Sequence, residues 1–463
     1  MLFNSFAFII FFVVVYLGWW LLPLRRGRMW LLLWSWVFYG WWDWRFLSLL
    51  LLTTTIDWGV GRLLASVRQE HRRPVLAMSV VANLGILAVF KYLGWFLEEA
   101  SALLSALQIP LSLPALKIVL PVGLSFYTFQ SLSYTIDVYR GQLQPRKEWT
   151  SFALFVAFFP QLVAGPIERA DRLIHQLENP SRPTPAQLST GFHLSLWGFF
   201  KKVFVADNLA VIVEGIFDTP VPPHGFLVLL GMYTFTWQIY GDFSGYTDIA
   251  RGVARWMGVE LMENFRFPLL ATSPQDLWRR WHISLSTWLR DYLYIPLGGN
   301  RLGEARTRLN LMATMILGGL WHGANWTFVA WGTAHGLALS VHRLVPETWR
   351  RRIPTWLAVV ATFHFTAITF LVFRSRDIHH AFALISSIAT SLTPAPGDLA
   401  LLGRITSIVT PLIVAEFFMW RRDDPELLLK LHPVFQLVIT VALFLAVVVL
   451  GAAYGQKFIY FQF

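Results

Sequence analysis

The sequence predicts an all-α, polytopic transmembrane helical bundle, and two observations predict this fold class. Of the 463 residues, 56% are hydrophobic and only 14% are charged, whereas soluble domains average about 45–50% apolar and about 25% charged residues. The apolar residues also fall in repeated blocks of roughly 20, the length of a helix that crosses about 30 Å of hydrocarbon. The alternating segments of about 10 residues that mark a membrane β-barrel are absent from the sequence. We therefore expect a single integral-membrane domain over residues 1–463.

Charge and composition exclude several function classes. Lys and Arg number 38 against 27 Asp and Glu, a net charge of +11. The basic residues stand in short loops between apolar blocks, where the positive-inside rule accounts for them, so we expect no nucleic-acid partner. Cysteine is absent, which excludes disulfides, thiolate metal sites and a covalent cysteine intermediate. No P-loop, dinucleotide-binding or metalloprotease motif occurs, and we expect neither a metal nor a permanently bound cofactor.

The first half of the chain shows alternating charge in its loops. Residues 1–24 are uncharged, and Arg25, Arg26 and Arg28 follow them. A cleaved signal peptide has the opposite order, so this block is predicted to be a retained span with its N-terminus outside. The later loops at 68–73 and 137–147 are basic, whereas the loop at 98–115 has no Lys or Arg. This alternation predicts five spans.

The second half departs from simple alternation. The apolar segment 152–164 has only about 13 residues, too few to cross, and we expect it to be re-entrant. Segments 191–213 and 226–240 are predicted to form an out-and-back pair. Residues 241–309 contain nine Arg and should lie on the cytoplasmic side. Segments near 356–373, 405–420 and 434–450 complete about ten crossings, with re-entrant segments, interfacial helices and both termini outside.

Residues 311–341 are apolar but have Arg308 before them and Arg343 after them. Both ends are therefore predicted to lie on the cytoplasmic side, and the segment is predicted to enter the membrane and return, with arms of about 22 Å. His322 stands at the apex, between glycines. An ionisable group at this depth is costly and usually faces a cavity or a partner. The residues alone leave open whether His322 is catalytic or is a structural histidine bonded to a carbonyl. His335 should lie on another helix face and pack.

Residues 275–300 form the densest polar stretch. Ser273 and Pro274 predict a helix start, and on that helix His282, Ser286 and Arg290 would share one side. Arg near a proton-handling group suits a phosphate-bearing acyl donor. The alternative is an amphipathic helix at the membrane interface whose Arg and Trp residues contact lipid.

Several charged residues fall within predicted spans. Asp57 and Arg62 are expected to approach as a pair. Two further groups, inside the sixth span and directly after the seventh, together imply a hydrated interior; they are Lys201, Lys202, Asp207, Asp242 and Asp248.

Two motifs carry a resemblance: Trp278-Arg-Arg-Trp-His-Ile-Ser-Leu-Ser-Thr-Trp-Leu-Arg-Asp-Tyr292 and Trp321-His-Gly-Ala-Asn-Trp326. With them the chain resembles the membrane-bound O-acyltransferase (MBOAT) family, and within it the bacterial alginate O-acetyltransferase membrane subunits. Segments 158–168, 241–248 and 458–463 agree. The resemblance implies that 241–341 is the catalytic segment, with His322 the catalytic histidine and His282 a second functional one. Donor and substrate binding is expected of five residues, Arg279, Arg280, Arg290, Ser286 and Asn325.

The resemblance further implies an acyl donor from the cytoplasm, acetyl-CoA, and transfer across a bacterial inner membrane for O-acetylation of an extracytoplasmic polysaccharide such as alginate. The expected partners are a periplasmic acetyltransferase, the polysaccharide acceptor reached indirectly, and membrane lipids. Two alternatives remain: a polysaccharide export channel or transporter, and a non-catalytic scaffold for a polysaccharide synthase. Without cysteine, acyl transfer would be direct and assisted by histidine.

Overall fold

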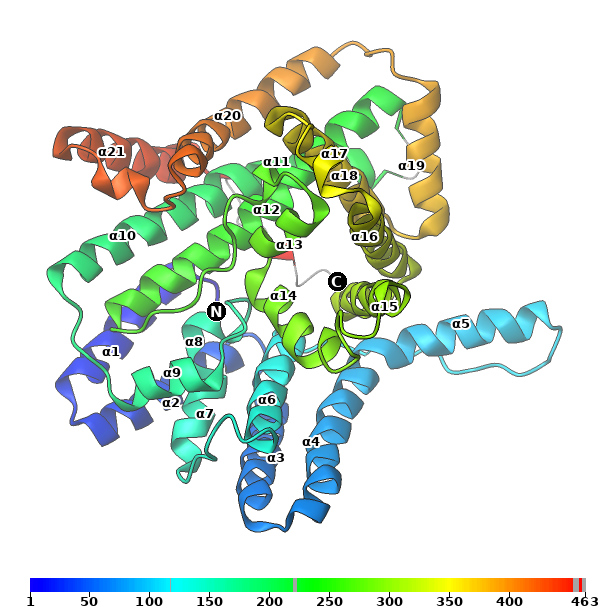
Figure 1. Ribbon diagram of the computed structural model, residues 1–463. Coiled ribbons are helices and arrows are strands. Elements are labelled where there is room, and N and C mark those ends of the chain that lie inside the picture. Colours follow the sequence, from blue (N-terminus) through cyan, green and yellow to red (C-terminus); the bar gives the residue numbers. More distant parts are fainter. Residues whose placement is uncertain (117, 220–222, 453–457, 460–463) are drawn as a thin grey trace. The chain divides into compact units, whose positions relative to one another are not determined.

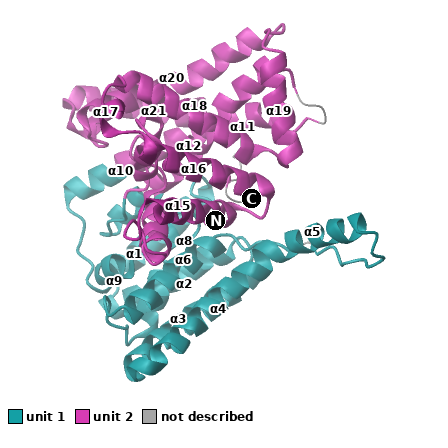
Figure 2. Cartoon of the chain, turned by 45° about the vertical axis from the view of Figure 1, so that its right-hand side comes forward, with its two compact units in different colours: residues 1–191, 250–262 teal, residues 192–249, 263–463 magenta. Residues whose placement is uncertain are grey.

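In the computed structural model, residues 1–116, 118–219, 223–452 and 458–459 are described, and every regular element in these ranges is a helix (Figure 1). The predicted all-α class is confirmed for them. The chain divides into two compact units, residues 1–191 with 250–262 and residues 192–249 with 263–463 (Figure 2). That the two units act as one membrane domain stays a prediction. Of the C-terminal segment 458–463, residues 460–463 lie outside the described part.

Four helical stretches are long and apolar enough to cross a membrane by length and composition: Trp44–Ser66, Gln69–Ala106, Thr355–Arg374 and Asp398–Arg422. Three further apolar helices have 10–17 residues, namely Phe6–Leu21, Ile378–Thr390 and Pro433–Val449. These helices agree with a membrane protein. The predicted number of ten crossings is not established by them and stays a prediction.

The first unit is built from short and medium helices in chain order. They are α1 (Phe6–Leu21), α2 (Leu24–Gly40), α3 (Leu47–Ser66), α4 (Arg72–Leu87), α5 (Leu93–Ala106), α6 (Leu124–Tyr139), α7 (Trp149–Ala157), α8 (Phe159–Leu162) and α9 (Ala170–Glu178). Helices α3, α4 and α6 pack together, while α5 has no buried residue and projects from them (Figures 1 and 2). Segment 152–164, predicted as re-entrant, forms α7 and α8, which are buried and too short to cross.

The predicted ion pair between Asp57 and Arg62 is replaced by hydrogen bonds in the described structure. Asp57, on α3, is fully buried and accepts from the Ser79 hydroxyl at 2.6 Å and from the Asn83 amide at 2.9 and 3.0 Å. Both donors come from α4. Neutral donors on the neighbouring helix therefore satisfy the carboxylate, a contact that spacing along α3 could not reveal.

The second unit holds α11 (Asp207–Phe217), α13 (Pro274–Arg280), α14 (Ile283–Leu289), α15 (Glu304–His322), α16 (Trp326–Leu344), α17 (Glu347–Arg350), α18 (Thr355–Arg374), α19 (Ile378–Thr390), α20 (Asp398–Arg422) and α21 (Pro433–Val449). Two helices, α10 (Pro185–Phe199) and α12 (Gly225–Trp256), begin in one unit and end in the other. A π-helical segment, Phe200–Ala206, joins α10 to α11.

The lysines and aspartates that the sequence places in or next to the spans of this unit are paired. Lys202 Nζ lies 2.7 Å from a carboxylate oxygen of Asp207 and 2.7 Å from one of Asp242, and all three side chains are at most 6% exposed. Lys201 pairs with Asp248 at 2.5 Å. Both aspartates from the motif at 241–248 lie inside α12, which continues past the predicted end of the span at residue 240. Ion pairs with Lys201 and Lys202 of the π-helical segment compensate the charge of these carboxylates, so that α12 can contain them without a break in the helix.

Helices α15 and α16 form the predicted hairpin, packed along their length (Figure 1). Glycines permit the close approach of the two arms. A Cβ at Gly319 would lie 2.2 Å from the carbonyl oxygen of Phe328, and one at Gly332 would lie 2.3 Å from that of Met315. The prediction that residues 311–341 turn back on themselves is therefore confirmed, and His322 ends the first arm.

Replacing Gly319 with alanine is expected to destabilise the protein by about 1–3 kcal/mol, because the added methyl group must force the arms apart. Thermal unfolding in detergent measures this loss. The matched control is Gly403→Ala in α20, where no heavy atom lies within 4 Å of the added carbon and no loss is expected. Equal unfolding temperatures for the two variants would contradict close packing of the hairpin.

Candidate functional site

His322 lies in an aromatic cluster at the end of α15. Its side chain is 5% exposed. The imidazole packs at a steep angle against three rings, with centroid distances of 5.1 Å to Trp321, 5.2 Å to Trp331 and 5.4 Å to Phe373. These rings come from both arms of the hairpin and from α18. They hold the imidazole in one place and limit the access of water to it.

His282 stands at a break between two short helices. Helix α13 ends at Arg280 and α14 begins at Ile283. His282 between them has φ 44° and ψ 54°, a left-handed conformation that is uncommon for a residue other than glycine. The prediction of one continuous helix carrying His282, Ser286 and Arg290 on one side is therefore wrong. The predicted helix start is confirmed, because the Ser273 hydroxyl accepts from the backbone N–H of Asp276 at 3.1 Å.

Hydrogen bonds that Asn264 accepts explain the break between α13 and α14. The carbonyl oxygen of Asn264 accepts from the backbone N–H of Ile283 at 2.9 Å. Its side-chain Oδ1 accepts from the Ser284 backbone N–H at 3.1 Å and lies 3.3 Å from His282 Nδ1. Hydrogen bonds to a distant segment thus replace those that a continuous helix would make, which offsets the strain of the left-handed residue.

The surroundings of His282 favour its neutral form. The side chain is fully buried, and its ring lies 4.7 Å from Phe243, 6.3 Å from Phe265 and 6.0 Å from Trp321 by ring centroids. The two flanking helices have seven residues each and cannot cross a membrane. Burial lowers the pKa of His282 from 6.5 to about 3, so the imidazole is uncharged at neutral pH.

The two predicted histidines meet at one aromatic residue. The indole of Trp321 contacts the ring of His282 at 6.0 Å and that of His322 at 5.1 Å. The structure thus brings together two residues forty positions apart in the sequence. Their convergence agrees with one shared site, while their catalytic roles stay a prediction.

The predicted donor-binding arginines lie on α13 or directly after α14. Arg280 pairs with Asp276 at 2.8 Å, one turn earlier on α13. Arg290 pairs with its neighbour Asp291 at 2.7 Å and remains 60% exposed, and Arg279 is exposed. Exposed guanidinium groups can still bind phosphate, but donor binding by these residues stays a prediction.

Ser286 and Asn325 have local contacts. The Ser286 hydroxyl donates to the carbonyl oxygen of Trp281 at 3.1 Å. Asn325 is the N-cap of α16: its Oδ1 accepts from the Thr327 backbone N–H at 3.0 Å, and its Nδ2 donates to the carbonyl of Arg376 at 2.8 Å. These bonds give both residues a structural role. Their contact with substrate stays a prediction.

His335 packs as the sequence predicts. It is 2% exposed and lies 4.6 Å from the Trp331 ring and 5.3 Å from the Trp278 ring. Its Nε2 is 3.2 Å from the Thr369 hydroxyl, which itself donates to the carbonyl of Thr366. His335 therefore acts as a structural histidine between α16 and α18.

Two residues of the site were missed in the sequence. Asn264 lies in an irregular stretch, where no helical or strand spacing singles it out. Trp321 stands next to His322 in the second motif, and nothing local indicates its contact with His282. Only the polar side chain of Asn264 among the aromatic residues that follow it could have drawn attention to it.

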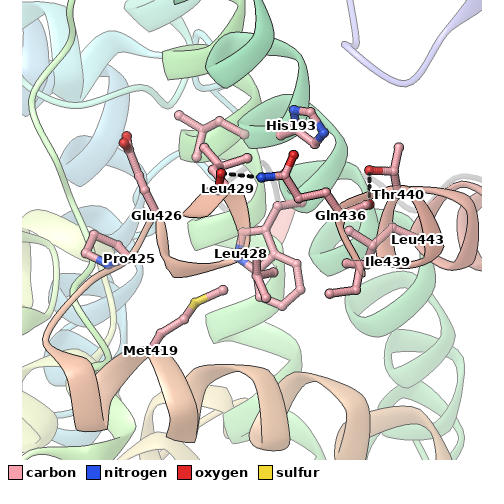
Figure 3. Close-up of a pocket in the computed structure, with 12 residues that line it drawn as sticks. His193, Met419, Pro425, Glu426, Leu428, Leu429, Gln436, Ile439, Thr440 and Leu443 are labelled. Atoms are coloured by element: carbon pink, nitrogen blue, oxygen red, sulfur yellow. Dashed lines mark hydrogen bonds between the residues drawn. The ribbon is translucent and has the colours of Figure 1, made fainter. Parts of the chain in front are cut away.

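A separate cavity lies elsewhere in the second unit. It has a volume of about 40 Å³, is partly open, and is lined mainly by apolar residues of α10, α20, α21 and the segment between the last two (Figure 3). Gln436 stands at its wall and donates to the carbonyl of Leu429 at 2.5 Å (Figure 3). None of the residues predicted for the site lines this cavity. In the described residues, no group of three or more His, Cys, Asp or Glu side chains is placed to hold a metal.

Comparison with known proteins agrees with the motifs. Residues 148–375 match the membrane-bound O-acyltransferase family, MBOAT, a range that contains both histidines. The chain is 41% identical to the probable alginate O-acetylase of Pseudomonas aeruginosa over 83% of this chain and 74% of that protein. It is 33% identical to the peptidoglycan O-acetyltransferase of Helicobacter pylori, over 83% and 79% respectively. It is 29% identical to the teichoic acid D-alanyltransferase of Bacillus subtilis, over 56% and 70%.

These relatives are named as enzymes of acyl transfer, which favours an enzyme over the export channel and the scaffold. Apolar helices long enough to cross a bilayer occur in the same chain. The chain therefore belongs to the membrane-bound O-acyltransferase family and is a membrane O-acyltransferase.

Proposed function

We propose that this chain takes an acetyl group from acetyl-CoA on the cytoplasmic side of a bacterial inner membrane and passes it across the membrane for O-acetylation of an extracytoplasmic polysaccharide such as alginate. The observation that carries the proposal is the convergence of His282 and His322 on Trp321, in a buried aromatic cluster. The similarity to O-acetylating relatives supports acetyl as the group transferred.

His322 is assigned the role of general base. Its place at the end of α15, next to Gly323, puts it at the turn of the hairpin. A hydroxyl group of the acceptor attacks the acetyl carbonyl carbon while His322 takes the hydroxyl proton. The new C–O bond forms, the C–S bond to CoA breaks, and the proton passes to the departing thiolate. No enzyme-bound thioester is needed, in keeping with the absence of cysteine.

The Arg-rich segment is assigned to the donor. Arg279, Arg280 and Arg290 lie on or directly after α13 and α14, and guanidinium groups match the phosphates of CoA. The positive-inside pattern supports a cytoplasmic position for this segment, on the side where acetyl-CoA is found, and periplasmic positions for both termini. A periplasmic acetyltransferase would then receive the acetyl group and modify the polysaccharide.

Sided membrane vesicles test this proposal. Inside-out vesicles that contain the protein are given acetyl-CoA labelled in the acetyl group. Label should appear in a lumenal acceptor and free CoA thiol should be released. Right-side-out vesicles, whose cytoplasmic face is enclosed, should take up no label. If neither preparation consumes acetyl-CoA, the donor assignment is overturned. Equal labelling in both preparations would also overturn it.

A further inference from the structure

The turn that carries His282 is held by Asn264, a residue outside the two helices α13 and α14 that flank the turn. Asn264 and His282 are both fully buried and lie 18 residues apart. Asn264 contacts three successive residues, through its backbone carbonyl to Ile283 and through Oδ1 to His282 and Ser284. Side chain and backbone of one residue thus set both the conformation of the turn and the position of the imidazole.

The pattern of donors determines where the imidazole carries its hydrogen. A backbone N–H can only donate, so the Asn264 atom that faces the Ser284 N–H at 3.1 Å is the amide oxygen. The hydroxyl of Ser284 donates to the same oxygen at 2.9 Å. His282 Nδ1 also faces this oxygen, at 3.3 Å, and must therefore carry a hydrogen.

The Ser284 hydroxyl does not reverse this assignment. It lies 3.5 Å from His282 Nδ1, longer than its 2.9 Å bond to Asn264. A hydroxyl has one hydrogen, which the shorter bond uses. The aromatic rings of Phe243, Phe265 and Trp321 around the imidazole favour its neutral form. A neutral imidazole with hydrogen on Nδ1 has its lone pair on Nε2.

We propose that Asn264 is a positioning residue that holds His282 with its hydrogen on Nδ1, so that Nε2 accepts a hydrogen bond from a hydroxyl or amide group of a substrate. This inference rests on the proposed role of His282 in acyl transfer. It excludes one form of that role, in which His282 donates a hydrogen bond to the acyl carbonyl oxygen, because an Nε2 with a lone pair has no hydrogen to donate. His282 therefore orients a donor group, the acceptor hydroxyl or an amide N–H of the CoA arm.

Two substitutions and a matched control test the proposal by activity. Asn264→Ala removes the acceptor for Nδ1 and should lower kcat by about 10- to 100-fold, the range by which outer residues that orient metal-bound histidines affect activity. Asn264→Asp keeps an acceptor oxygen and should restore most of the activity near neutral pH. The control is Asn310→Ala in α15, because Asn310 is equally buried and donates to the carbonyl of Gly299 at 2.9 Å.

The pH profile separates positioning from a merely structural role. The carboxylate of Asn264→Asp favours the imidazolium form and raises the pKa of His282. Below that raised pKa Nε2 carries a hydrogen and can no longer accept. The acid limb of the kcat profile should therefore move to higher pH in Asn264→Asp and stay in place in Asn310→Ala. An acid limb unchanged in Asn264→Asp would overturn the proposal.

Nitrogen-15 NMR of histidine-labelled protein reads the tautomer without activity, with the His282 signals assigned by their loss in His282→Gln. The wild type should show hydrogen on Nδ1 alone, and Asn264→Ala a mixture; hydrogen on Nε2 in the wild type overturns the proposal. Full activity in His282→Ala would instead remove the proposed role of His282, leaving the NMR result to judge the tautomer. If His282→Ala is inactive while Asn264→Ala matches Asn310→Ala, the positioning role is wrong.

Discussion

Replacing His322 with alanine is expected to abolish acetyl transfer while leaving the protein inserted and folded. Removing a general base costs typically about 10²- to 10⁴-fold in rate, and His322 is the histidine assigned to take the acceptor proton. The variant should still fold, because Trp331 and Phe373, whose rings surround His322, remain in place. Label transfer from acetyl-CoA in inside-out vesicles measures the loss, and size-exclusion elution in detergent checks the fold.

His335→Asn is the control for this variant. His335 lies on the other arm of the same hairpin, is similarly buried, and contacts Trp331 as His322 does. It has no role in the proposed reaction, so this variant should lose stability but keep its turnover per folded molecule. Near-normal turnover in His322→Ala would contradict the assignment of the base, and equal loss in both variants would show that only packing was disturbed.

Replacing Lys202 with methionine is expected to destabilise the protein by about 3–5 kcal/mol, because it leaves two buried carboxylates without their cation. Lys202 lies 2.7 Å from both Asp207 and Asp242, and Asp242 also accepts from the backbone N–H of Ile459 at 2.7 Å. The variant should therefore loosen the packing of α12 against the π-helical segment. Denaturant or thermal unfolding in detergent measures the change.

Lys430→Met provides the comparison. Lys430 pairs with Asp424 at 2.5 Å, but its side chain is 64% exposed, and solvent-exposed pairs add little to stability. This variant should unfold close to the wild type. The double variant Lys202→Met with Asp207→Asn should recover part of the loss, because it removes one of the uncompensated charges. Equal unfolding temperatures for Lys202→Met and Lys430→Met would contradict the prediction that the buried ion pairs of Lys202 contribute more to stability than the exposed pair of Lys430.

Much of the fold could be predicted because its signals are local. Apolar blocks predict helices in a membrane, and Arg308 and Arg343 at the two ends of one block predict a hairpin rather than a crossing. The cap at Ser273 follows from residue type alone. His322 was found in the same way, as an ionisable residue in an apolar segment. The motifs at 278–292 and 321–326 then identified the family.

The sequence by itself thus determined the helical class, the hairpin and both candidate histidines. Only the tertiary structure decided that the helix breaks at His282, that Lys202 pairs with Asp242, and that Trp321 contacts both histidines. The physical reason is distance along the chain. Helical periodicity reports neighbours three and four residues away, whereas Asn264 acts on His282 from 18 residues away. Hydrogen bonds and ion pairs that close such loops override local helix propensity where a buried polar group must be satisfied.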